Sequence, residues 1–186
     1  MIGQQQKDQA EKWFKDLRDK ICKEFEILEE DHLKLAPKSD MAAKKFERKS
    51  TIRETDDKED GGGGVMATLK GGRIFEKVGV NVSAVYGNLA PEAQKSITAR
   101  KAIPELKDDP RFWASGISLV AHMRNPHTPA IHLNTRMFWT PHAWWFGGGT
   151  DLNPSIENDD DTNFFHQTLK KKCDKHNQSY YKKFKE

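Results

Sequence analysis

Residues 112–138 read FWASGISLVAHMRNPHTPAIHLNTRMF, and this stretch decides the expected fold. Apolar and polar side chains alternate along 116–122 and again along 131–139, which is the period of a strand with one buried face. Between them, 123–130 contains Asn125-Pro126 and Pro129, residues typical of turns. A connection of this length returns the chain antiparallel to itself. The stretch therefore predicts two neighbouring strands of an antiparallel sheet.

Other segments add strands and helices around this pair. Strands are predicted at 65–69, 73–85 and 143–146, separated by Gly, Pro and Asn turns. The polar segment 91–110 contains prolines and is predicted to be a loop that carries a short helical turn. Helices at both ends of the chain enclose these strands. The pattern predicts an α+β fold with a large antiparallel β-sheet flanked by helices.

The two terminal helices are predicted from apolar side chains at helical spacing. In the helix expected over 7–31, the apolar stripe consists of Trp13, Leu17, Ile21, Phe25 and Leu28, with Phe14 and Cys22 beside it. In the helix expected over 160–175, it consists of Phe164, Phe165, Leu169 and Cys173. Charged residues occupy the other face of the first helix, which favours a packing role for it.

The segment between the first helix and the sheet is less defined. Residues 38–60 are mostly charged, and they predict either a short helix or a mobile flap. Gly61 to Gly64 follow, and they predict either a linker or hinge, or a loop that approaches another group closely. We therefore expect one domain over 1–186, with a charged helical arm and flap at 1–60 and the sheet and cleft at 61–186.

Composition narrows the class of protein. The 186 residues carry 31 Lys and Arg against 28 Asp and Glu, a net charge of +3 that is too small and dispersed to indicate nucleic acid. No apolar run approaches the roughly 18 residues of a membrane helix. Two cysteines without a CxxC pair argue against a disulfide framework or a cysteine-rich zinc site, and they predict a cytoplasmic, reducing location. Dinucleotide-binding, P-loop, GxSxG and CxxCH motifs are also missing from the sequence.

Polar side chains on the two central strands form a candidate site. Strict alternation places His132, Asn134 and Arg136 on one face of their strand. On the preceding strand, Ser118 and His122 share a face. If the polar faces coincide, these five residues converge on one patch that offers a guanidinium for carboxylates and imidazoles that titrate near neutral pH. The alternative is a polar face that meets only water.

Further residues leave two interpretations open. His122, His132 and His166 are three nitrogen donors that either bind a metal or line a pocket, and no spacing matches a zinc motif such as HExxH. Asp151, just beyond three glycines, either accepts hydrogen bonds from substrate N–H groups or caps a turn. The run of aromatic residues at 144–146 either forms a wall against a flat ligand or fills the core.

These stretches resemble the oxygen-dependent coproporphyrinogen III oxidases. The matching text is GGGG at 61–64, GGRIFEKVGVNVSAVYG at 71–87, FWASGISLVAHMRNPHTPAIHLNTRMF at 112–138, AWWFGGGTDLNP at 143–154 and FFHQTLKKKCDKH at 164–176. The resemblance implies a flat antiparallel sheet flanked by helices, a homodimer, and a cytoplasmic or organellar location. It also implies oxidative decarboxylation of two propionates of coproporphyrinogen III to vinyl groups, giving protoporphyrinogen IX. Molecular oxygen is the co-substrate, and no redox cofactor is implied.

The resemblance also implies residue roles. His132 matches the proton donor of the family, and Asp151 matches an acid that addresses pyrrole N–H groups. Ser118, Asn134, Thr135 and Arg136 match substrate-binding positions. The histidines at 122, 132 and 166 match residues that have been assigned to a divalent metal cation.

The sequence departs from the family pattern in two places. Val65-Met66-Ala67 stands where many relatives carry a basic, Ser-containing stretch. Phe184-Lys185-Glu186 ends the chain where a Trp-Cys-Asp run is expected to begin, so we expect an N-terminal portion of the family domain. Two alternatives to the oxidase remain: a truncated, non-catalytic remnant that binds tetrapyrrole or a partner subunit, and a metal hydrolase built on the histidines.

Overall fold

The computed structural model of the chain describes residues 3–36, 40–55 and 57–185. A long helix, α1 (Gln4–Leu35), precedes the sheet. The strands are β1 (Glu47–Glu54), β2 (Asp60–Lys70), β3 (Phe75–Asn88), β4 (Arg111–Met123), β5 (Ala130–Trp139) and β6 (Trp144–Asn153). Helix α2 (Pro91–Lys101) and the 3₁₀ helix η1 (Pro104–Lys107) connect β3 to β4, while α3 (Asp159–Asp174) and α4 (Tyr180–Lys185) follow β6.

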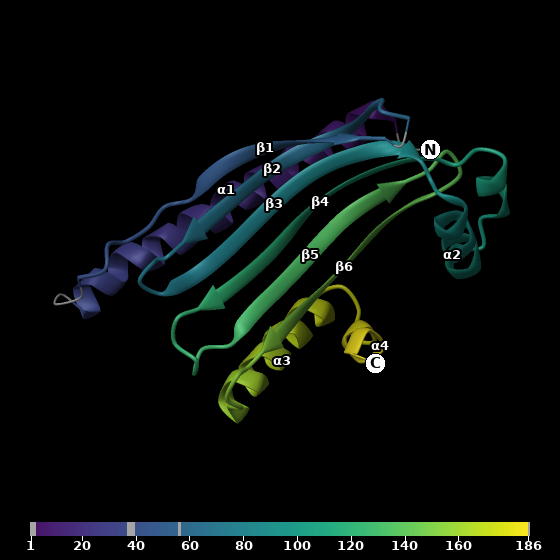
Figure 1. The fold of residues 1–186 in the computed structure, drawn as a ribbon. Coiled ribbons are helices and arrows are strands. Elements are labelled where there is room, and N and C mark those ends of the chain that lie inside the picture. Colours follow the sequence, from purple (N-terminus) through teal and green to yellow (C-terminus); the bar gives the residue numbers. More distant parts are fainter. Residues whose placement is uncertain (1–2, 37–39, 56, 186) are drawn as a thin grey trace.

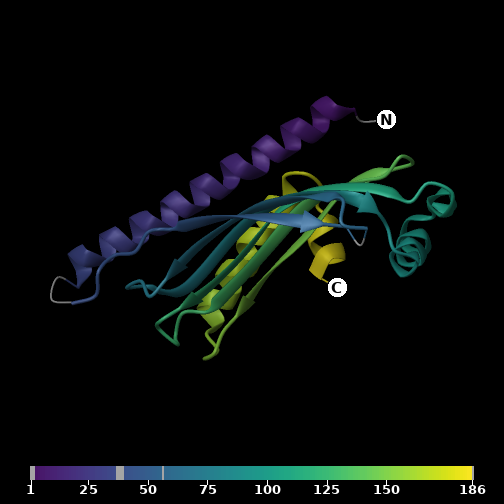
Figure 2. The same ribbon diagram turned by 45° about the horizontal axis from the view of Figure 1, so that its top comes forward.

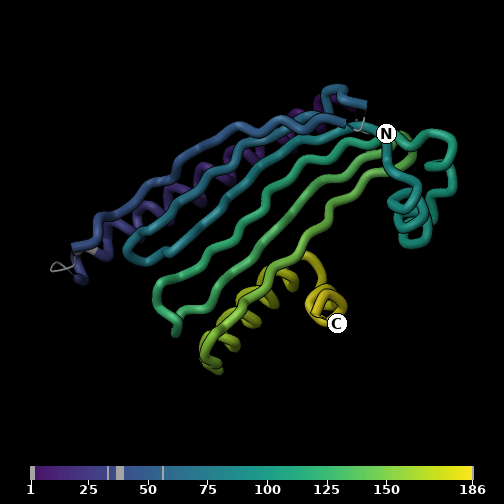
Figure 3. Tube along the Cα trace, viewed as in Figure 1, coloured from purple at the N-terminus to yellow at the C-terminus, as the bar shows by residue number. Residues whose placement is uncertain are grey.

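The described strands form one antiparallel meander in the order β1-β2-β3-β4-β5-β6 (Figures 1 and 3). Each strand pairs with the next along the chain, and every connection is a short turn except the one from β3 to β4, which contains α2 and η1. The prediction of an α+β fold with a large antiparallel sheet is confirmed. Each strand predicted from 65 onward is present, and most are longer than predicted.

Helix α1 covers one face of the sheet, against β3 and β4 (Figure 2). Phe14 on the helix and Val78 and Val80 on β3 are completely buried, and Phe25 stacks on Phe75 with ring centroids 4.7 Å apart. In the described part of the chain, no helix lies across the opposite face, which we call the open face (Figure 1). The fold therefore places its apolar core on one side of the sheet and leaves the other side available to ligands.

The apolar stripe of the first helix is displaced from the predicted one. Trp13 and Leu28 are 55% and 47% exposed, whereas Phe14 and Cys22 lie in the core. A straight α-helix turns 100° per residue, so side chains spaced four apart move progressively around its surface. The first and last residues of such a stripe therefore cannot both face a flat sheet. Glu29 takes the place expected of Leu28: it is fully buried and accepts backbone hydrogen bonds from Arg73, Ile74 and Phe75.

Positions 38, 39 and 56 lie outside the described residues, and the described residues of 38–60 include a strand and form neither a short helix nor a free flap. Strand β1 pairs with β2, and the four glycines lie within β2, so the linker or hinge interpretation is wrong. A Cβ at Gly63 would stand 2.2 Å from the Thr51 carbonyl oxygen, and one at Gly64 would stand 2.3 Å from that of Val82. The glycines are therefore required by close approach between neighbouring strands.

Two more predicted boundaries need correction. The segment at 91–110 contains an 11-residue helix, α2, followed by η1, because proline at the first position of each helix costs no hydrogen bond. Strand β6 continues through Gly147–Gly149 to Asn153 instead of ending at 146. None of the described helices is long and apolar enough to cross a membrane.

Candidate active site

The register of the sheet brings the predicted polar residues onto the open face. Ser118 pairs with Asn134, and Asn81 of β3 pairs with Ser118 from the other side. Because paired residues of antiparallel strands point to the same face, these side chains form a polar row across three strands. His132 lies one step further along β5, paired with Val120 on β4. The prediction that the polar faces of the two central strands coincide is confirmed.

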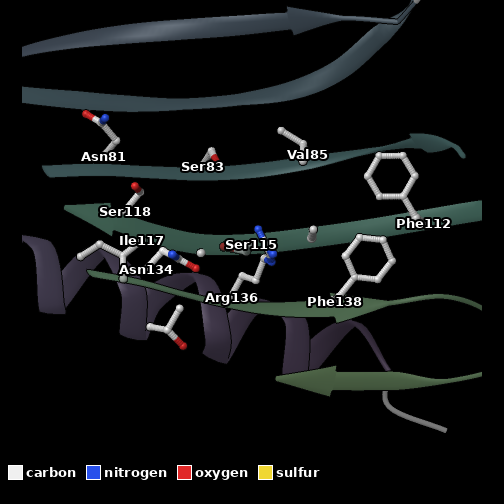
Figure 4. A pocket seen from close by; sticks show the side chains of 13 residues that line it. Asn81, Ser83, Val85, Phe112, Ser115, Ile117, Ser118, Asn134, Arg136 and Phe138 are labelled. Atoms are coloured by element: carbon white, nitrogen blue, oxygen red, sulfur yellow. The ribbon is translucent and has the colours of Figure 1, made fainter. Parts of the chain in front are cut away.

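A hollow of about 490 Å³ lies on this face over β3, β4 and β5 (Figure 4). Its lining consists of Asn81, Ser83, Val85, Phe112, Ala114, Ser115, Gly116, Ile117, Ser118, Asn134, Thr135, Arg136 and Phe138. Figure 4 shows Arg136 between a polar end at Asn81 and Ser118 and an aromatic end at Phe112 and Phe138. An anionic ligand with an apolar body matches this lining.

Glycines explain why Arg136 has room to reach into the hollow. It pairs with Gly116 on β4 and with Gly147 on β6, so neither neighbour carries a side chain on the open face. A Cβ at Gly116 would lie 2.6 Å from the Cβ of Arg136. The guanidinium is therefore exposed between two glycines, where it can donate two parallel hydrogen bonds to a carboxylate.

An aromatic row borders the same region. Phe138 stacks between Phe112 and Trp145, with ring centroids 5.7 Å and 4.9 Å away. Trp145 thus forms part of an aromatic wall on the open face. Its neighbours Trp144 and Phe146 point to the other face and are 48% and 61% exposed, so the expectation that these aromatics fill the core is wrong for both.

His132 and Asp151 form a hydrogen-bonded pair beside the hollow. Asp151 pairs with His132 across β5 and β6, and His132 Nδ1 lies 3.0 Å from Asp151 Oδ1. Asn153 Nδ2 also donates to Asp151 Oδ1. Both side chains of the pair are about half exposed on the open face. Asp151 lies within a strand, so its role is not to cap a turn.

The structure does not assemble the predicted metal ligands. His122 and His132 lie edge to face with ring centroids 6.4 Å apart, and His132 Nδ1 faces Asp151. His166 is on α3, where its Nδ1 lies 3.0 Å from the Tyr181 hydroxyl. Within residues 3–36, 40–55 and 57–185, no group of three or more His, Cys, Asp or Glu side chains could hold a metal ion. The donor set therefore does not fit a divalent cation.

Thr135 borders the hollow, but strand alternation directs its side chain toward the face that α1 covers, so only its backbone adjoins the open face. Sequence reasoning did not single out Asn81, Ser83 or Phe112. The sequence pattern could have identified Asn81 and Ser83, because they alternate with Val78, Val80 and Val82, which are buried on the other face. Phe112 could be assigned to the site only once the register between β4 and β5 was known.

Comparison with known proteins agrees with this geometry. The family model described as coproporphyrinogen III oxidase matches residues 9–186. Oxygen-dependent coproporphyrinogen-III oxidases from Rickettsia peacockii and Rickettsia felis are each 45% identical to this chain, over 96% and 95% of it and 58% of their own length. One from Rickettsia bellii is 41% identical over 99% of this chain and 60% of its own length. The chain therefore spans about three fifths of the curated relatives it matches, and it belongs to the coproporphyrinogen III oxidase family.

Proposed function

We propose that the chain carries the substrate cleft of an oxygen-dependent coproporphyrinogen III oxidase, which forms protoporphyrinogen IX without a redox cofactor. The observation that carries this proposal is Arg136, exposed between Gly116 and Gly147 on the open face, with the His132–Asp151 pair two same-face positions further along β5. In each turn of the reaction, one propionate, one oxygen molecule and one proton give a vinyl group, carbon dioxide and hydrogen peroxide. Two electrons pass from the side chain to oxygen, and the atoms balance.

In this proposal the residues have separate tasks. Arg136 binds a propionate bidentately and holds the macrocycle in register. Ser118 and Asn134, with the backbone at Thr135, contact the substrate beside it. Asp151 Oδ2 makes no hydrogen bond to the described residues, so it is available to accept one from a pyrrole N–H, and this raises the electron density of that ring. His132 then donates or accepts the proton of the reacting group.

No step of this mechanism is assigned to a metal, since the histidines at 122, 132 and 166 do not converge. The remaining features concern location and assembly. Cys22 and Cys173 are both free thiols, which supports a reducing compartment such as the cytoplasm. Exposed Trp144 and Phe146 beside the edge of the sheet support association with a second copy, as a homodimer. Light scattering of the purified chain over a range of concentrations tests that assembly.

Turnover in air tests the proposed activity. The purified chain is incubated with coproporphyrinogen III, and the products are oxidised to porphyrins and separated; loss of carboxyl groups with gain of vinyl groups is the expected result. Arg136→Gln should raise KM at least tenfold, because a charge-assisted contact with the substrate is lost, while Arg100→Gln on the exposed side of α2 should not. Porphyrin binding without any vinyl product in air would contradict the activity and favour the non-catalytic tetrapyrrole-binding alternative.

A further inference from the structure

Two cations stand at the ends of the aromatic row, and neither has a role in the function proposed above. The guanidinium carbon of Arg53, on β1, lies 5.7 Å from the centroid of the Phe112 ring. The ammonium nitrogen of Lys101, at the end of α2, lies 5.3 Å from the centroid of the Trp145 ring. Because Phe138 stacks between those two rings, one continuous row connects the two positive charges.

We propose that Arg53 and Lys101 are carboxylate-binding residues that make this site selective for a macrocycle with carboxylates around its whole periphery. The proposal rests on the proposed function and specifies which ligands the same site prefers. The aromatic row offers an apolar surface to the body of such a ligand, and a cation at each end meets a peripheral carboxylate. Arg136 supplies a third contact in the hollow beside the row.

Arg53 is held in place before any ligand arrives. Its Nη1 donates to the carbonyl oxygens of Tyr86, at 2.9 Å, and Gly61, at 3.4 Å. Its Nε and Nη2 donate to none of the described residues, so one edge of the guanidinium remains available. An arginine fixed in this way loses less side-chain entropy on binding a carboxylate than a mobile one does.

Nearby carboxylates do not neutralise Arg53. Asp60, at the start of β2, accepts hydrogen bonds from the Tyr86 hydroxyl at 2.5 Å and from the Gly62 N–H at 2.8 Å. The hydrogen bond from Tyr86 lowers the pKa of Asp60, so this carboxylate stays ionised but is already engaged. In the described part of the chain, Arg53 forms no ion pair with an acidic side chain.

Lys101 is placed by the end of α2. Ala102 adopts a left-handed conformation with φ of 54°, and its N–H donates to the Thr98 carbonyl oxygen, which ends the helix at Lys101. Ile103 and Leu106, just beyond, are buried, and the Thr98 hydroxyl donates to the Ile103 carbonyl oxygen. This anchor holds the lysine over Trp145, and no acidic partner among the described residues pairs with it.

The selectivity follows from counting charges. In this proposal, a ligand with four peripheral carboxylates meets all three cations, Arg136, Arg53 and Lys101, whereas a ligand with two carboxylates on one side meets only part of this set. Each exposed charge-assisted contact changes affinity by roughly three- to tenfold. We therefore expect a tetracarboxylate to bind more tightly than a dicarboxylate of the same ring system, by about one to two orders of magnitude.

Binding of two fluorescent porphyrins tests this inference on the full chain. Coproporphyrin III, with four propionates, is titrated beside deuteroporphyrin IX, with two, and dissociation constants are measured for the wild type, Arg53→Gln, Lys101→Gln and the double variant. Each single variant should weaken coproporphyrin binding roughly three- to tenfold and reduce the ratio between the two ligands. Lys95→Gln, an exposed lysine on the same helix, is the matched control and should change neither constant.

The outcomes separate this inference from the proposed function. Tight coproporphyrin binding that falls in Arg136→Gln but is unchanged in both Arg53→Gln and Lys101→Gln overturns the inference and leaves the proposed function standing. Failure of the wild type to bind coproporphyrin overturns the inference, while the turnover of coproporphyrinogen III, measured separately, decides the proposed function. Arg53 also joins β1 to β2 and β3 through its hydrogen bonds to the Gly61 and Tyr86 carbonyl oxygens, so Arg53→Gln can unfold the chain. In that case Lys101→Gln, which replaces an exposed side chain, decides the result.

Discussion

The imidazole of His132 and the carboxylate of Asp151 are directly paired across β5 and β6, with Nδ1 and Oδ1 3.0 Å apart. The contact follows from register alone, because a one-residue slip of β6 would move Asp151 to the other face. A carboxylate facing Nδ1 keeps the proton on that nitrogen, so Nε2 is left as the acceptor. The pair therefore determines which nitrogen is presented to a ligand on the open face.

Asp151→Asn should disturb this arrangement without unfolding the chain, since the residue is 58% exposed. We expect the nitrogen NMR spectrum of His132 to lose its single tautomer, with a proton on Nδ1, and to show a mixture. Under the proposed activity, turnover should fall by roughly 10²-fold or more, as for loss of a group that orients a general acid or base. Asp159→Asn, in the first turn of α3, removes the same charge elsewhere and should affect neither measurement.

A second prediction concerns Gly116, which lies opposite Arg136. A methyl group there would lie 2.6 Å from both the Arg136 Cβ and the Thr135 carbonyl oxygen. We expect Gly116→Ala to lower the free energy of unfolding by about 1–3 kcal/mol and to weaken porphyrin binding, because Arg136 and its strand must shift. Gly147→Ala adds the same methyl group with nothing within 4 Å and should leave stability nearly unchanged. Equal losses in the two variants, measured by urea denaturation, would contradict this account.

Much of this site could be predicted from the sequence, because alternation defines faces without knowledge of the fold. The period of two along 116–122 and 131–139 was enough to group Ser118, Asn134 and Arg136, and the register confirmed the grouping. Long-range contacts were not accessible in this way. The hydrogen bonds that Glu29 accepts from Arg73, Ile74 and Phe75 join residues 44 or more positions apart, and the glycines of β2 resemble a linker until the neighbouring strands are in place.

The roles of Arg53 and Lys101 could not be predicted from the sequence for the same reason. Each lies in a segment that the sequence described only as charged or polar, and each acquires its place from a ring on a distant strand. Spacing along the chain carries no information about such a contact. The choice between a metal site and a pocket lining for the three histidines was inaccessible on similar grounds, since only the path of α3 decides whether His166 reaches the sheet.

A third prediction concerns Cys22, which lies on α1, belongs to the core and is 3% exposed. Burial raises the pKa of its thiol from 9.0 to about 11. The thiol is therefore protonated in the folded chain at pH 8, and iodoacetamide should modify Cys173 first while Cys22 reacts only after addition of urea. The part of the unfolding free energy that comes from this raised pKa is fully present below pH 9 and is lost as the pH rises through 11. The unfolding free energy of wild type minus that of Cys22→Ala should thus decrease between pH 9 and 11.

The last prediction tests how α1 is fixed to the sheet. Glu29 accepts N–H donors from Arg73, Ile74 and Phe75 at 2.7–3.0 Å, with neither oxygen exposed to water. Glu29→Ala leaves these donors buried without an acceptor, so we expect a loss of about 3–5 kcal/mol in the free energy of unfolding. Glu29→Gln retains one acceptor oxygen and should lose less. Glu30→Ala removes an exposed neighbour whose only described ion pair, with Lys45, is 3.9 Å long, and it should cost less than about 0.5 kcal/mol. Similar denaturation midpoints for Glu29→Ala and Glu30→Ala would show that the turn between β2 and β3 does not depend on this carboxylate.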